Sequence, residues 1–190
     1  SPPWQILPIL RPGTEPLRQL EQIFAAPGID FPAQTDEGQG RFSSQKWLQA
    51  VSHVVNSEAA NASTRFLLIV DQVEELVTLC RADERAQFIE RLCLLLSEFA
   101  GRIHIVLTLR NDFEPHIRNT CLQTYWENGR FVVAPMNQQE LKEVIERPAA
   151  ARVLFFDPPD LVDKIAEEVV HEPNALPLLS FTLSQLYRRY

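Results

Sequence analysis

The sequence predicts an α/β fold, in which a parallel sheet flanked by helices is followed by a small all-helical subdomain. Two nearly continuous apolar segments, 66–70 and 103–109, are rich in branched side chains, which is typical of strands buried on both faces of a parallel sheet. Between them, apolar residues recur at helical spacing from Glu84 to Ala100. We therefore expect a βαβ unit whose two strands end at the same edge of the sheet.

The chain before this unit is expected to form a further strand and a helix. Trp4–Leu10 has the composition of a strand, and Pro8 favours an edge position because proline has no N–H to donate to a neighbouring strand. The residues 11–13 then predict a turn, which leads to a helix with Pro16 in its first turn.

Further elements are predicted on both sides of the two apolar strands. The stretch 26–42 is rich in Gly, Pro, Asp and Gln and predicts a loop, after which a helix begins at Ser43 or Ser44. Downstream of the second strand, we expect a helix at 115–126 and a short strand at 131–134.

The periodicity beyond this point is purely helical, which predicts two domains. Residues 1–135 form the α/β part and residues 136–190 the helical subdomain. Asn137 is the expected N-cap of the first helix of that subdomain.

Composition narrows the class of protein. With 190 residues, 45% of them hydrophobic, the chain can bury a sizeable core. A net charge of −7, only three lysines and no basic run argue against nucleic-acid binding. No apolar run approaches the roughly 20 residues needed to span a bilayer, and the N-terminus lacks a signal-peptide pattern. We expect neither a nucleic-acid partner nor a membrane segment.

The three cysteines, Cys80, Cys93 and Cys121, are odd in number and lack the paired spacing of a zinc site. We expect reduced thiols, and a cytoplasmic protein.

Acidic side chains begin where the strand 66–70 ends. Asp71 follows the strand directly, and Glu74 and Glu75 come about one helical turn later. Nucleotide hydrolases use such an arrangement to hold Mg²⁺ and to orient water. In the alternative, Glu74 and Glu75 only favour the dipole of a helix N-terminus.

Arg110 follows the second apolar strand and is expected at the same edge as Asp71. An arginine there can sense a terminal phosphate. The alternative is an ion pair with Asp112 or with a neighbouring helix.

Five short motifs occur in one order along the chain: Arg11-Pro12-Gly13 with Pro16, then 70–76, 109–113, 146–149 and 175–179. Together they resemble the STAND class of P-loop NTPases, and more narrowly the bacterial novel STAND NTPase domains that are often fused to WD40 or other repeat arrays. The resemblance covers nearly the whole chain and implies an ASCE/AAA-related P-loop fold. It also implies a signalling switch, in which a repeat region senses a signal, ATP binding drives assembly and attached effectors respond.

The resemblance assigns roles to individual residues. Asp71 resembles the Walker B aspartate that holds Mg²⁺ through water. Glu74 and Glu75 match the acidic pair that follows Walker B in NACHT NTPases and is thought to position hydrolytic water. Gln72 stands where many related ATPases have a catalytic Glu, which argues against rapid hydrolysis.

Two further residues match motifs at a distance from the acids. Arg110 resembles the sensor arginine after the next strand. Pro177 resembles the proline of a Gly-x-Pro motif that contacts adenine, although Ala175 replaces the glycine. A place in the first turn of a helix explains Pro177 equally well.

The expected phosphate-binding loop is absent, because no lysine follows a glycine-rich loop at the required spacing. In the family, this P-loop and its strand precede the segment that begins around Trp4. We therefore expect a fragment that lacks the P-loop strand, binds ATP weakly or not at all, and has no measurable ATPase activity. The missing strand would lie beside the one that ends at Arg110, so its loss should expose apolar edges. The fragment would then need pairing with the upstream P-loop segment, self-association or repacking to be soluble.

Two functions remain open on the sequence. The first is part of an ATP-dependent signal-transduction switch that uses ATP and Mg²⁺ when complete. The second is a non-catalytic interaction or scaffold module on a degenerate P-loop fold.

Overall fold

The computed structural model describes residues 2–25, 44–56, 63–172 and 175–188. Contacts between residues divide the chain into two compact units, Ser1–Arg130 and Phe131–Tyr190. The predicted loop at 26–42 lies outside the described residues.

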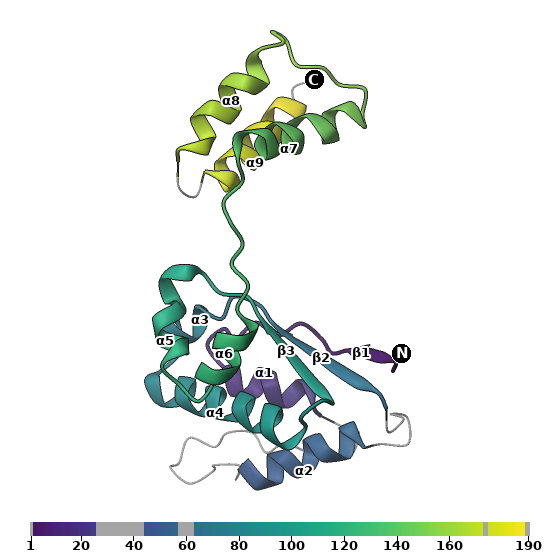
Figure 1. Cartoon of the computed structure of the whole chain (residues 1–190), viewed down its shortest axis with the longest axis vertical. Coiled ribbons are helices and arrows are strands. Elements are labelled where there is room, and N and C mark those ends of the chain that lie inside the picture. Colours follow the sequence, from purple (N-terminus) through teal and green to yellow (C-terminus); the bar gives the residue numbers. More distant parts are fainter. Residues whose placement is uncertain (1, 26–43, 57–62, 173–174, 189–190) are drawn as a thin grey trace. The chain divides into compact units, whose positions relative to one another are not determined.

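A three-stranded parallel sheet forms the centre of the first unit (Figure 1). Its strands are β1 (Trp4–Ile6), β2 (Arg65–Val70) and β3 (Ile103–Leu107), in the order β1-β2-β3. The edge position expected for the first strand is therefore confirmed. The strand is shorter than predicted because it ends before Pro8, and Leu10 makes only an isolated bridge to Val70.

Helices of the first unit pack on one face of this sheet. Phe66, Leu68 and Val70 alternate along β2 and are buried in a single apolar cluster, to which the helices contribute large side chains such as Trp47 and Phe88. The helical segments are α1 (Pro16–Ile23), α2 (Ser44–Val55), α3 (Glu75–Thr78), α4 (Ala82–Glu98), the 3₁₀ turn η1 (Asn111–Phe113), α5 (Glu114–Arg118) and α6 (Gln123–Gly129).

The opposite face of the sheet carries exposed apolar side chains. Ile6 is paired with Leu67 in the strand register, and Val106 with Ile69, so these residues share one face. Ile6 is 66% exposed, Val106 47% and Trp4 50%. We call this surface, formed by Trp4, Ile6, Leu67, Ile69 and Val106, the open face.

The direction of the chain explains why one face is open. Connections between parallel strands are right-handed, so successive strands that advance across a sheet in one direction have their connecting helices on one face. β1, β2 and β3 advance in one direction. The connecting segments that the structure describes therefore gather on one side (Figure 1).

The second unit contains the helices α7 (Gln138–Ala150), α8 (Leu161–Val170) and α9 (Leu176–Arg188). They enclose a small core formed by Leu141, Ile145, Val162, Ala166 and Leu179. Asn137 caps α7 as predicted: its side chain accepts a hydrogen bond from the Glu140 N–H, and the Glu140 carboxylate accepts one from the Asn137 N–H.

Two predicted elements differ in the structure. The helix expected at 115–126 is interrupted between α5 and α6, where the Thr120 hydroxyl donates to the Ile117 carbonyl and competes with helical hydrogen bonding. The strand expected at 131–134 is wrong, because this segment pairs with no strand among the described residues and its apolar side chains are exposed.

The expectation of three reduced cysteines is also wrong. Cys93 in α4 and Cys121 between α5 and α6 form a disulfide, with their Cα atoms 6.3 Å apart. They are separated by 28 residues, and only the packing of α5 and α6 beside α4 brings them together. Cys80 is a free thiol. Among the helices that the structure describes, none is long and apolar enough to cross a membrane.

Candidate functional site

Asp71 lies at the carboxyl end of the central strand and is held from both neighbouring strand ends. The Thr108 hydroxyl, just beyond β3, donates to Asp71 Oδ1 at 2.6 Å. Arg11, beyond β1, places Nε 3.2 Å and Nη2 3.1 Å from Asp71 Oδ2. Each carboxylate oxygen therefore has its own partner.

These contacts favour the ionised carboxylate. The hydrogen bond from Thr108 lowers the pKa of Asp71 below its ordinary value, and the hydrogen bond and positive charge of Arg11 act in the same direction against the opposing effect of partial desolvation. Asp71 is consequently a carboxylate at neutral pH.

The loop that follows Asp71 is fixed to the end of β3. The Gln72 N–H donates to Thr108 Oγ1 at 3.0 Å, and the Val73 N–H donates to the Thr108 carbonyl at 3.0 Å. Gln72 has a φ of 58°, which is uncommon for a residue with a side chain and makes the sharp change of direction after the strand. Its side chain is exposed.

The two glutamates occupy different surroundings at the start of α3. Glu75 Oε2 accepts a hydrogen bond from the backbone N–H of Gly13 at 2.8 Å. Glu74 Oε2 is buried and has no hydrogen-bond partner within the structure. A buried carboxylate oxygen without a donor has unused capacity for a ligand or for water.

Arg110 emerges at the same edge as Asp71, because β2 and β3 are parallel and Val70 is paired with Leu107. Its guanidinium is turned to Asp112, with Nε 3.2 Å from Oδ1 and Nη2 2.8 Å from Oδ2. It also lies over the Phe113 ring, 5.5 Å from the ring centre. The ion pair with Asp112, the alternative role of this arginine, is therefore present.

Pro177 belongs to the second unit. It is an exposed residue in the first turn of α9. This is the position that its alternative, structural interpretation requires.

Sequence reasoning did not assign roles to Arg11, Gly13 or Thr108. The contact from Arg11 to Asp71 joins residues 60 positions apart, and that from Thr108 joins residues 37 apart. In the sequence, Thr108 could have been noticed as a single hydroxyl residue near the end of an apolar strand. Arg11 and Gly13 could have been noticed because they belong to a short motif to which no functional role is assigned.

The residues at this edge fit a magnesium ion that takes one or two ligands from the protein and the others from water and phosphate. Mg²⁺ commonly uses one or two carboxylates, with water and substrate phosphate completing its octahedron. Asp71 is ionised and half-exposed, and Glu74 has an unpartnered oxygen close by in sequence. Within the described part of the chain, no group of three or more His, Cys, Asp or Glu side chains could hold a metal ion alone.

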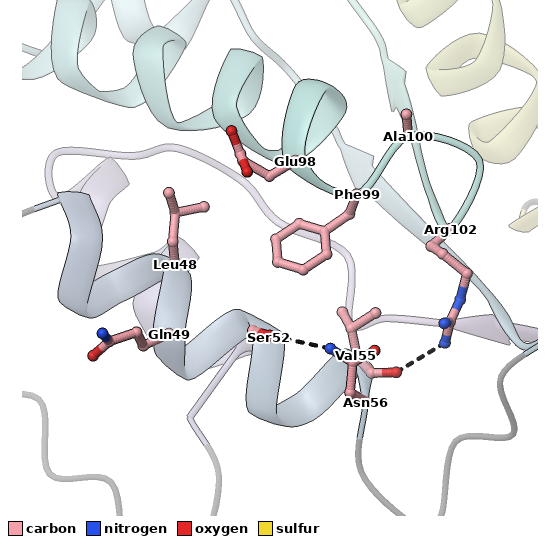
Figure 2. Close-up of a pocket in the computed structure, with 9 residues that line it drawn as sticks. All are labelled: Leu48, Gln49, Ser52, Val55, Asn56, Glu98, Phe99, Ala100 and Arg102. Atoms are coloured by element: carbon pink, nitrogen blue, oxygen red, sulfur yellow. Dashed lines mark hydrogen bonds between the residues drawn. The ribbon is translucent and has the colours of Figure 1, made fainter.

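A separate pocket of about 450 Å³ lies at the other end of the strands (Figure 2). Leu48, Val55 and Phe99 form its apolar wall, and Arg102 donates to the carbonyls of Val55 at 2.8 Å and Thr64 at 2.7 Å. Arg102 thereby ties the end of α2 to the start of β2. None of the predicted site residues lines this pocket.

A small parallel α/β sheet with an acidic loop at its carboxyl edge is compatible with a P-loop-like NTPase fold. The family Novel STAND NTPase 1 matches residues 1–190, and the chain belongs to this family of STAND NTPase domains. Comparisons with curated proteins and with solved structures found no match.

Proposed function

We propose that this domain is part of an ATP-dependent signal-transduction switch. In the complete protein, Asp71 would hold Mg²⁺ through water, Glu74 and Glu75 would orient water near the terminal phosphate, and Arg110 would sense that phosphate. Pro177 would contact adenine from the helical subdomain. Bound Mg²⁺ would neutralise part of the negative charge of the phosphates.

The observation that carries the proposal is the position of Asp71. It is ionised, it lies at the carboxyl end of the central strand, and Thr108 and Arg11 fix it from the two adjacent strand ends. Ligands of open α/β sheets bind at this edge. The loop geometry thus provides a prearranged carboxylate where a nucleotide-bound metal ion would lie.

The proposed phosphate cradle is an upstream P-loop segment, and the open face supports this partner. Suppose that the upstream segment adds a strand beside β3. The helix that connects this strand to β1 would then cross the sheet in the direction opposite to the order β1-β2-β3. The right-handed rule would place that helix on the open face, over Ile6 and Val106. One added strand and helix would therefore cover both the free edge of β3 and the open face.

The proposed switch would work with further parts of the same protein. A repeat-bearing sensor region of the WD40 type would detect the signal, and self-association would transmit it. Arg110 would then have to leave Asp112 to reach a phosphate, which an exposed ion pair allows at little energetic cost.

A second candidate function is a non-catalytic interaction module. The exposed apolar side chains of the open face favour it, because contiguous apolar surface is typical of docking sites. In this case Arg110 and Asp112 would remain paired permanently, and the upstream partner would bind without any nucleotide.

Calorimetry with ATP and Mg²⁺ distinguishes the two functions. We expect no measurable binding by residues 1–190 alone, and binding by a chain extended upstream through the next strand and loop. Absence of binding in both chains would contradict the switch and support the interaction module.

The role of Asp71 is tested in the same extended chain. Asp71→Asn keeps the shape but removes the charge, and we expect Mg²⁺-dependent ATP binding to fall by at least about tenfold. Asp112→Asn serves as a control with equal charge change at the same sheet edge, and should not weaken binding, because it releases Arg110. Unchanged binding in Asp71→Asn would remove this residue from the mechanism.

A further inference from the structure

Among the residues that the structure describes, Arg11 is the partner of Asp71 at its Oδ2 atom, and the proposed function leaves open what happens to this ion pair when a cation binds. Both Nε and Nη2 of Arg11 approach the same oxygen, at 3.2 and 3.1 Å. The other oxygen, Oδ1, receives the shorter hydrogen bond from Thr108. A cation that approaches Asp71 must therefore compete with the Arg11 guanidinium for the charge of this carboxylate.

Thr108 is the less easily displaced of the two. Its backbone N–H donates to the Val70 carbonyl, and its own carbonyl accepts from Val73, so both sides of the residue belong to the sheet edge. The side chain of Arg11 is long and 65% exposed. An exposed ion pair of this kind is weak and exchanges readily.

The turn that carries Arg11 does not depend on the ion pair for its position. The Asp71 N–H donates to the Leu10 carbonyl at 2.8 Å, just before Arg11, and the Gly13 N–H donates to Glu75 at 2.8 Å, just after it. The Cys80 thiol donates to the Gly13 carbonyl at 3.0 Å. The backbone of Arg11 is thus held on both sides, and its side chain can release Asp71 without moving the turn.

We infer that Arg11 is a counter-ion that occupies the Asp71 carboxylate until a divalent cation displaces it. The inference rests on the proposed function, because it deepens the role of the same carboxylate. The positive charge of the guanidinium competes with the cation, so it weakens the binding of a metal ion to Asp71 when no phosphate assists. Arg11 is a positioning residue in this scheme and reacts with nothing itself.

The test measures Mn²⁺ affinity of the 190-residue chain without nucleotide, by calorimetry and by water proton relaxation. Arg11→Ala should bind Mn²⁺ about two- to fivefold more tightly than the unaltered chain, because an exposed ion pair no longer competes. Arg11→Lys should restore much of the competition, since the charge is kept. Arg18→Ala is the matched control: it removes an equal charge from the same region of the chain, where Arg18 pairs with Glu15 and not with Asp71, and the Mn²⁺ affinity should not change.

A direct signal from Arg11 complements the affinities. Addition of Mg²⁺ should shift the side-chain Nε–H resonance of Arg11 in nuclear magnetic resonance spectra, whereas NaCl at equal ionic strength should shift it much less. Asp71→Asn combined with Arg11→Ala should abolish the gain in Mn²⁺ affinity.

Equal Mn²⁺ affinity of the Arg11→Ala and unaltered chains, including the case in which neither binds, would overturn the inference. Loss of ATP binding by the extended Asp71→Asn chain together with equal Mn²⁺ affinities would overturn the inference and leave the proposed function standing. Tighter Mn²⁺ binding by Arg11→Ala together with no ATP binding by the extended chain would support the counter-ion role and contradict the proposed nucleotide switch.

Discussion

At the scale of single residues, the acidic edge is organised by one hydroxyl group. Thr108 donates to Asp71 Oδ1 and accepts from the Gln72 N–H, so a single side chain fixes both the carboxylate and the turn that follows it. The hydroxyl hydrogen is committed to Asp71 because the backbone N–H can only donate. A hydrogen bond donated to Asp71 favours the ionised carboxylate, which explains why the pKa of Asp71 is lowered.

Thr108→Val should raise the pKa of Asp71 toward its ordinary value, because it removes the hydroxyl but keeps the branched shape. A lowered pKa in the folded state stabilises the fold above the pKa of the unfolded chain, and this contribution disappears as the pH falls through the folded-state value. The variant should therefore be less stable than the unaltered chain at pH 7. This difference in the free energy of unfolding should be smaller at about pH 3.

Carbon-detected magnetic resonance of the Asp71 carboxyl group, followed from pH 7 downward, gives the pKa directly. Ser97→Ala removes a hydroxyl from α4, where the group donates to the Leu94 carbonyl, and should leave the pKa of Asp71 unchanged. An equal pKa in Thr108→Val and the unaltered chain would show that the hydroxyl does not control this carboxylate.

At the scale of elements, α1 and α4 are joined by a nearly buried ion pair. Arg91 Nη1 lies 2.7 Å from Glu21 Oε1, and the two side chains are only 8% and 15% exposed. The Arg91 guanidinium also lies over the Trp47 ring of α2, 5.2 Å from its centre. One arginine therefore connects three helices on the covered face of the sheet.

Arg91→Ala should lower the free energy of unfolding by about 3 kcal/mol, because it leaves Glu21 charged, poorly hydrated and unpaired. The measurement is urea denaturation at pH 7. Arg18→Ala breaks the exposed pair with Glu15 and should cost less than about 1 kcal/mol. If the two variants lost similar amounts of unfolding free energy, burial would not increase the contribution of the Arg91–Glu21 pair to stability.

The sequence predicts elements well where the local pattern is sufficient. The apolar runs locate β2 and β3, Ser44 begins α2, and Asn137 caps α7. The pattern fails at 131–134, because an apolar segment becomes a strand only when a partner strand is available, and none pairs with it among the described residues.

The candidate site is predicted only in part, for a similar reason. The carboxylates follow a strand and are visible in the sequence, whereas their partners Arg11 and Thr108 come from other strands. The direction in which a long side chain turns is also absent from the pattern: Arg110 reaches the expected edge and pairs with Asp112. The pairing of Cys93 with Cys121 likewise depends on how α5 and α6 pack.

At the scale of the whole first unit, the sheet has one covered and one open face. Parallel sheets are normally buried on both faces, because their strands are apolar throughout. Here helices cover the face of Phe66 and Leu68, whereas Ile6 and Val106 on the other face are largely exposed. An exposed apolar surface of this kind is typical of an interaction site, through which copies of the chain can associate.

We expect the 190-residue chain to self-associate through the open face as its concentration rises. Ile6→Lys places a charge on this face and should shift sedimentation toward the monomer. Phe155→Lys introduces the same charge at an apolar residue of the second unit that is 81% exposed, and should have little effect. Sedimentation velocity over a range of concentrations tests this expectation, and an unaltered chain that stays monomeric throughout would contradict it.

The strand register also governs the order in which this domain can fold. Trp4 is paired with Arg65, and Phe66 with Ile103, so every ladder joins residues that are far apart in the chain. Pairings of this kind incur the entropy of closing a long loop before they gain any stabilising contact, which makes parallel sheets slow to form. On a ribosome, β1 must wait until β2 has been synthesised before it can pair. During that interval Leu10, which is buried in the folded unit, is open to contact with other unfolded chains, so the yield of folded protein should depend on chaperones more steeply than its final stability suggests.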